Sequence, residues 1–242
     1  MKRFSRVLLT AVSGVIMAVV SAAGVQAAGL ISPGHFSTNF ADGNAYWYST
    51  ADASINVNRN TFIFRPSRNG GPASIYHATL LYVTINTPTF SGSDCFQIPD
   101  SDFVQSNGVQ SATLNAYVDA SNLCYGFATA LDGTLAGAGC GKGCPPPPVA
   151  DIPLPMTVSL TWSGNGVTTS SVSSAHSICA GFNMAGQASD KSAYSTAAGT
   201  LTFYDGVTSP VVLSASDFAS VDQGSSQYDN QGSVDPRCFG GV

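Results

Sequence analysis

The chain has 242 residues, of which only 10% are charged, and all 14 acidic residues are Asp. The absence of Glu excludes metal motifs that require it, such as the His-Glu-x-x-His zinc helix and the EF-hand loop. The formal net charge of −5 disfavours nucleic acid as a partner, and the scarcity of Glu and Lys disfavours a helical fold.

The first 27 residues have the features of a cleaved signal peptide. Three basic residues precede an apolar run at 7–20, and residues 25–27 form a small-x-small cleavage pattern. The run is shorter than the ~20 residues of a membrane-spanning helix. We therefore expect a mature chain of residues 28–242 that is secreted or displayed at the cell surface, without membrane insertion. Its net charge would fall from −5 to −8, because three of the nine basic residues are removed. The lack of an N-glycosylation sequon favours a bacterial source.

The first predicted strand, at 45–50, carries the best candidate binding site. In a strand, Tyr46 and Tyr48 point to one face and Trp47 to the other, so one face is partly exposed or contacts a partner. Aromatic rings beside a polar Asn44 could stack on a sugar ring or anchor a protein interface. We predict Asn44, Tyr46, Trp47 and Tyr48 as binding residues, with core packing as the alternative.

Two predicted strands follow, at 54–65 and 75–85. In the first, Ile55 and Val57 fall on one face and Phe62 and Phe64 on the other, which predicts a bulge or tight turn near residues 58–60. In the second, both faces are largely apolar. This pattern predicts a central strand covered on both sides, with His77 buried in the core.

Further strands are predicted where apolar and polar residues alternate or where apolar runs lie between turns. They cover 111–118, 122–130, 156–163, 168–175, 178–183, 200–204 and 209–214. Trp162 lies on the apolar face of its strand and is predicted to be core, and a short helical turn is predicted near residues 216–218. Roughly ten short strands separated by turns predict an all-β fold, an antiparallel β-sandwich.

Residues 135–155 are rich in Gly, Cys and Pro and include a run of four prolines. Such a run favours a stiff polyproline II segment. We interpret it as a long loop within a single domain of residues 28–242. The alternative is a linker between two small β domains.

The six cysteines, Cys95, Cys124, Cys140, Cys144, Cys179 and Cys238, all lie in the mature part of the chain. An even number in an exported protein predicts three disulfides. Pairing between near neighbours costs the least loop-closure entropy, which favours 95–124, 140–144 and 179–238. The C-x3-C spacing at 140–144 has no Cys/His pair nearby to complete a zinc site, so no metal or cofactor is predicted.

Catalytic candidates are few. No Gly-x-Ser-x-Gly elbow is present, and His35 lies near the mature N-terminus, which leaves His176, beside serines and Cys179, as the candidate base. Asp100 and Asp102 could form the carboxylate pair of a glycosidase, although a turn with side-chain-to-backbone hydrogen bonds explains them more simply. Oxygen-rich loops near Asp42 and Asp229 offer calcium ligands without a regular spacing.

The preferred function is that of a secreted or cell-surface, non-catalytic protein that binds carbohydrate or a protein partner. The first alternative is a secreted, Asp-dependent hydrolase that resembles a glycosidase in its chemistry. The second is a structural component of a surface or matrix, suggested by the high Ser, Thr and Gly content.

Overall fold

The computed structural model describes residues 34–49, 52–66, 73–106, 108–124, 149–179 and 182–231. These residues form one antiparallel sheet of ten strands, with two single turns of 3-10 helix. The strands are β1 (Gly34–Trp47), β2 (Ala53–Pro66), β3 (Ser74–Asn86), β4 (Ser91–Ile98), β5 (Phe103–Gln105), β6 (Ser111–Val118), β7 (Met156–Cys179), β8 (Phe182–Phe203), β9 (Val211–Leu213) and β10 (Phe218–Gln231). The turns are η1 (Asp100–Asp102) and η2 (Ala120–Asn122).

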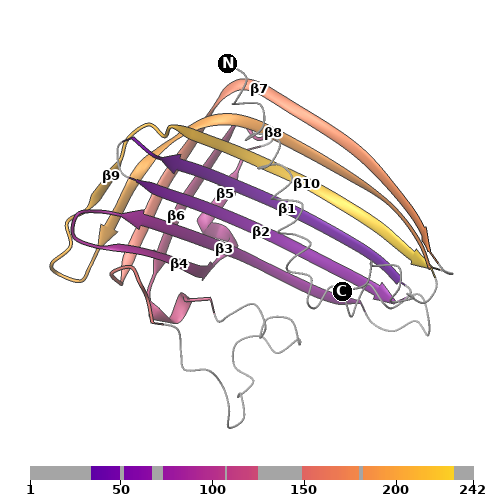
Figure 1. The fold of residues 1–242 in the computed structure, drawn as a ribbon, viewed down its shortest axis with the longest axis horizontal. Coiled ribbons are helices and arrows are strands. Elements are labelled where there is room, and N and C mark those ends of the chain that lie inside the picture. The colour runs from indigo at the N-terminus through magenta and orange to yellow at the C-terminus, as the bar shows by residue number, and fades with distance from the viewer. Residues whose placement is uncertain are drawn as a thin grey trace, which may run out of the picture.

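The strand order is β4-β3-β2-β1-β10-β8-β7-β6-β5, and β9 pairs with β8. Neighbours in the sheet are also neighbours in sequence, except at the centre, where β10 pairs with β1 on one side and with β8 on the other. The sheet curls into a half-barrel, so that β5 and β6 lie behind β1, β2 and β3 (Figure 1). The all-β antiparallel prediction is confirmed. Among the described residues, however, one curled sheet takes the place of the two facing sheets of a sandwich.

The core fills the concave, inner side of one end of the sheet. Its largest buried side chains are Trp47, Trp162, Phe96 and Phe103, which confirms the prediction for Trp162. Phe103 enters from β5 and packs on Gly43 of β1, where a Cβ would lie only 3.1 Å from its ring. A glycine is needed there because the aromatic ring approaches the backbone closely.

The predicted bulge or tight turn near residues 58–60 is wrong, because β2 pairs with both β1 and β3 without a register shift. Ile55 and Val57 point inward to the core, whereas Phe62 points to the outer face. The core occupies only one end of the concave side. Phe62 therefore points outward because of its position in an unshifted strand, and the backbone needs no bulge to place it there.

The far half of the sheet is built from the long strands β1, β2, β7, β8 and β10. Gly224 of β10 leaves room for the ring of Phe40, since a Cβ there would lie 2.5 Å from that ring. Residues 168–179 of β7 pair with β8, and within the described part of the chain they have no partner on their other side. This stretch is the upper edge of the sheet in Figure 1.

The predicted Cys95–Cys124 disulfide is present, with a Cα–Cα distance of 5.3 Å. It joins β4 to the residues that follow η2, beside the isolated bridge between Phe96 and Leu123. Cys140, Cys144, Cys238 and the side chain of Cys179 lie outside the described residues, so the other two pairings stay predictions.

Two further predictions are not tested by the structure, because the signal peptide at 1–27 and most of the 135–155 segment lie outside the described residues. The predicted helical turn at 216–218 is wrong, because extended strand β10 begins at Phe218. No helix in the described ranges has the length and apolar character needed to cross a membrane.

Candidate functional site

Four aromatic rings gather on the outer face of the sheet, behind the core. Tyr46 and Tyr48 come from β1 and its end, Phe218 from β10 and Tyr194 from β8. Ring centroids are 5.9 Å apart for Tyr46–Tyr48, 5.9 Å for Tyr46–Phe218 and 6.0 Å for Tyr194–Phe218. Tyr48 is 70% exposed, Tyr194 43% and Phe218 38%. We call these four residues the aromatic strip.

A carboxylate fixes the exposed end of the aromatic strip. Asp217 accepts hydrogen bonds from the backbone N–H of Tyr48 (2.7 Å) and Ser49 (2.9 Å), and from the Ser49 hydroxyl (2.7 Å). These bonds from Ser49 and Tyr48 lower the pKa of Asp217, so it is ionised at neutral pH. The backbone that carries Tyr48 is therefore held in place before any ligand arrives.

The phenol of Tyr46 lies at the half-buried centre of the aromatic strip. Burial, together with the neighbouring Tyr48, raises the pKa of Tyr46. The hydroxyl therefore keeps its proton at neutral pH and can donate a hydrogen bond.

The predicted binding residues are divided between the two faces. Trp47 is fully buried, and its Nε1 donates to the carbonyl oxygen of Ser214 at 2.6 Å. Asn44 is half-buried on the outer face, two residues before Tyr46, and its carbonyl oxygen accepts from Trp162 Nε1 at 3.0 Å. Sequence reasoning found Tyr46 and Tyr48 but missed Phe218 and Tyr194, whose strands lack an apolar alternation.

The inner face beyond the core forms an open, polar trough with a volume of 540 Å³. One row of facing residues crosses it from Lys191 through Gln223 and Ala41 to Arg59. Gln105 of β5 closes its core-side end by donating to the carbonyl oxygens of Asp42 (3.0 Å) and Asp222 (2.8 Å).

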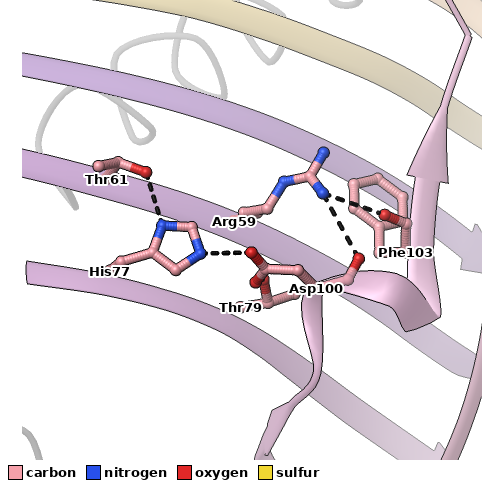
Figure 2. A network of polar contacts seen from close by, with 6 residues as sticks. All are labelled: Arg59, Thr61, His77, Thr79, Asp100 and Phe103. Carbon is pink, nitrogen blue, oxygen red and sulfur yellow. Dashed lines mark hydrogen bonds and ion pairs between the residues drawn. The ribbon is translucent and has the colours of Figure 1, made fainter.

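A polar network, shown in Figure 2, includes Arg59, which also lines the trough. His77 Nε2 contacts Asp100 Oδ2 at 2.5 Å, and His77 Nδ1 contacts the Thr61 hydroxyl at 2.6 Å. Thr79 donates to the other carboxylate oxygen of Asp100 at 2.6 Å. Arg59 donates to the carbonyl oxygen of Phe103 at 3.3 Å. The network joins η1 and β5 to β2 and β3.

The predicted burial of His77 is wrong, because its side chain is 40% exposed. His77 shares its face with buried Leu81 but lies beyond the end of the core, where the trough begins. Partial burial would raise the pKa of Asp100, but hydrogen bonds from Thr79 and His77 and nearby positive charge lower it overall. Asp100 therefore ties η1 to β3 through an anionic side chain, a contact that its Pro-Asp-Ser-Asp sequence does not reveal.

A cluster of three carboxylates lies on the outer face of the far half. Asp42 of β1 faces Asp222 of β10, and Asp190 of β8 is close by. Burial, then the charges of Asp222 and Asp190, raise the pKa of Asp42 well above its usual value. Asp42 Oδ1 has no hydrogen-bond partner among the described residues, whereas Asp222 accepts from the Ser220 hydroxyl at 2.8 Å.

We expect Asp42→Asn to stabilise the protein at neutral pH. The folded state keeps the Asp42 proton at pH values where the unfolded chain has lost it, so the free energy of unfolding falls as pH rises above about 4. An amide removes this loss, and the expected gain at pH 7 is roughly 1–3 kcal/mol. Urea unfolding across pH 3–8 measures it.

Asp205→Asn is the control, because its effect on the free energy of unfolding at neutral pH should have the opposite sign to that of Asp42→Asn. Hydrogen bonds from Thr208 and Val207 lower the pKa of Asp205, so its contribution is present above the unfolded pKa and is lost in acid. A flat difference between wild type and Asp42→Asn across the pH range would contradict the role of Asp42.

The remaining candidates are dispersed. His35 contacts Asp229 at 2.8 Å near the far end of the sheet. Only the backbone of His176 is described, and Asp102 accepts from the Ser101 hydroxyl at 3.2 Å. Within the described ranges, no group of three or more His, Cys or Asp side chains is arranged to hold a metal ion.

Comparison with known proteins does not assign a family. No family model matches the chain, and no curated protein is significantly similar to it. A solved structure of a protein from Nitrosomonas europaea, provisionally named AttH, aligns at 6% identity over 84% of this chain with a TM-score of 0.27. The chain spans about half of that protein, 52% of its length.

Proposed function

We propose that this is an exported, non-catalytic protein that binds carbohydrate through the aromatic strip. The observation that carries the proposal is the exposure of Tyr48, Tyr194 and Phe218 as neighbouring rings on one face. Exposed aromatic side chains of this kind are costly to leave in water and are typical of interaction surfaces.

The chemistry beside the rings favours a sugar over a purely apolar partner. The phenol of Tyr46 can donate, and the Asp217 carboxylate can accept, while the side chain of Asn44 offers both donor and acceptor groups. Sugars combine apolar C–H faces with hydroxyls at the ring edge. A ring that stacks on Tyr48 would therefore meet both kinds of group.

The test is binding of the purified mature chain to immobilised cellulose, chitin and xylan. We expect retention on at least one of them, and a loss of affinity of at least tenfold in Tyr48→Ala, which corresponds to about 1.4 kcal/mol. Tyr48→Phe keeps the ring and should retain most of the affinity. Val207→Ala, at a side chain 87% exposed in a turn, should change nothing. Equal retention of Tyr48→Ala and wild type would refute the proposal.

A second candidate function, a component of a surface or matrix assembly, is favoured by the edge of β7. Residues 168–179 contain no Lys, Arg, Asp or Pro, the residues that natural proteins use to protect an edge strand. Two copies could pair along this edge by backbone hydrogen bonds. Val172→Lys, at a side chain 81% exposed, should abolish any concentration-dependent association seen by analytical ultracentrifugation. A wild-type chain that stays monomeric at all concentrations excludes this candidate.

The hydrolase alternative gains less from the structure. The groups that contact the Asp100 side chain in the structure are His77 and Thr79, both of β3, so the carboxylate ties η1 to that strand. A glycosidase site would need a second carboxylate facing it across the bound sugar.

A further inference from the structure

A second pair of tyrosines lies on the same outer face as the aromatic strip. Tyr117 of β6 and Tyr204, directly after β8, have ring centroids 6.2 Å apart. They are 55% and 56% exposed. The hydroxyl of Thr157 donates to Tyr204 Oη at 3.3 Å, which ties the pair to β7. We call Tyr117 and Tyr204 the tyrosine pair.

Hydroxyl side chains cover the outer face between the two aromatic groups. In β7 and β8 they alternate with buried core residues, because each strand turns one face to the core and the other to solvent. Six of them form what we call the hydroxyl floor: Thr157, Ser159, Thr161, Ser163, Thr200 and Thr202. The register places Thr157 opposite Thr202 and Ser159 opposite Thr200, so the floor is continuous across the two strands.

The two aromatic groups are joined by β8, with Tyr194 near the middle of the strand and Tyr204 directly after its end. Tyr194 and Tyr204 are ten residues apart along β8, which at ~3.3 Å per residue is about 33 Å. The outward side chains between them are Thr196, Ala198, Thr200 and Thr202, none of which is large enough to block the path.

We propose that the aromatic strip, the hydroxyl floor and the tyrosine pair form one extended site for a linear, β-1,4-linked glycan. This inference rests on the proposed function and extends it from a single sugar to a chain. A β-1,4-linked pyranose chain is straight and turns apolar C–H faces outward along its length. It can therefore stack on rings at both ends while its hydroxyls meet the Ser and Thr side chains between them.

Two platforms on one rigid face predict a dependence of affinity on chain length. A short oligosaccharide reaches one platform only, whereas a chain that spans both makes the second contact intramolecular. Such linkage can raise affinity by roughly 10²- to 10⁴-fold without any new type of contact. We expect a gain of at least tenfold for a chain that spans both platforms. This figure lies below the range above, because two weak platforms on a convex face do not match a straight chain ideally.

The experiment measures binding of four probes by isothermal titration calorimetry: cellobiose, cellohexaose, chitobiose and chitohexaose. The glucose and N-acetylglucosamine series distinguish the two common sources of a β-1,4-linked chain. In the series that binds, wild type should hold the hexamer at least tenfold more tightly than the dimer. The Tyr117→Ala/Tyr204→Ala double variant should lose this gain and keep the affinity for the dimer.

Tyr48→Ala separates this inference from the proposed function. It should weaken the dimer and the hexamer alike, since both contact the aromatic strip. The Tyr117→Phe/Tyr204→Phe variant keeps both rings and should keep the length dependence. Binding of the dimer without a length dependence, or an undiminished length dependence in the alanine double variant, would overturn the inference and leave the proposed function intact. Failure of all four probes to bind would overturn the extended site together with the carbohydrate proposal for these sugars.

Discussion

Replacing Trp47 by Ala is expected to lower the free energy of unfolding by roughly 3–5 kcal/mol. The side chain is fully buried among the inner residues, and its Nε1 donates to the Ser214 carbonyl oxygen at 2.6 Å. Truncation leaves a large cavity and a carbonyl oxygen without its partner, and neither loss can be repaired by small shifts in a sheet that is paired on both sides of β1. Urea unfolding followed by tryptophan fluorescence measures the change, with Trp162 as the remaining reporter.

Because Trp47→Ala is expected to destabilise the fold, Tyr48→Ala is the better variant for testing the binding site. Tyr48 is next to Trp47 in sequence but lies on the opposite face, so Tyr48→Ala should change the free energy of unfolding by about 0.5 kcal/mol or less. A binding defect in Tyr48→Ala would therefore report on ligand contact. The same defect in Trp47→Ala would report on the fold. If Trp47→Ala unfolded at the same urea concentration as wild type, the placement of its ring in the core would be wrong.

Removal of the Cys95–Cys124 disulfide is the second large effect expected. The bridge closes a loop with a sequence separation of 29 residues, which corresponds to roughly 3–4 kcal/mol of loop-closure entropy. It also holds β4 beside the chain that follows β6, where the two ends of the curled sheet approach each other. The Cys95→Ala/Cys124→Ala double variant avoids a free thiol and should unfold at a clearly lower urea concentration.

Ser93→Ala is a matched control for the disulfide variant. Ser93 lies on the same strand, and its hydroxyl contacts Thr84 at 2.8 Å on the exposed surface. Its loss should cost no more than about 0.5 kcal/mol. A double cysteine variant as stable as Ser93→Ala would contradict a structural role for the bridge.

The parts of the fold that the sequence reveals are those where a core lies on one side. Residues 111–118 and 156–163 alternate clearly because β6 and the first part of β7 cover the core, and both are strands as predicted. Alternation alone does not distinguish two facing sheets from one sheet that curls over its own core. Curvature depends on how distant strands pair, and local sequence carries little of that information.

The far half of the sheet was predicted poorly for the same physical reason. In β8 and β10 most residues beyond the core are small or polar on both faces, so no clear apolar period is visible. The predicted strand at 168–175 is part of β7, and the one predicted at 178–183 overlaps the end of β7 and the start of β8, which pair from Cys179 and Phe182 onward. These strands are specified by pairing with their neighbours more than by their own side chains.

The sequence predicts only half of the aromatic strip. Tyr46 and Tyr48 could be placed on one face by parity, and Trp47 on the other. The partners Phe218 and Tyr194 come from strands 170 and 146 residues further along than Tyr48, and only the three-dimensional register brings them together. The Asp100–His77 contact was hidden similarly, because the 3-10 turn that carries Asp100 crosses from one edge of the sheet to the other.

Pairing of β1 with β10 has a consequence for how the chain can fold. Gly34 faces Asn230, so the central seam of the sheet joins the first and last described strands. At a synthesis rate of about 5–20 residues per second, β1 waits on the order of ten seconds or more before its partner exists. During that interval β1 has an open edge. Pairing of β1 with β10 joins residues that are far apart in sequence, and contacts of such high contact order form slowly. The central seam of the sheet can therefore close only after β10 has been synthesised.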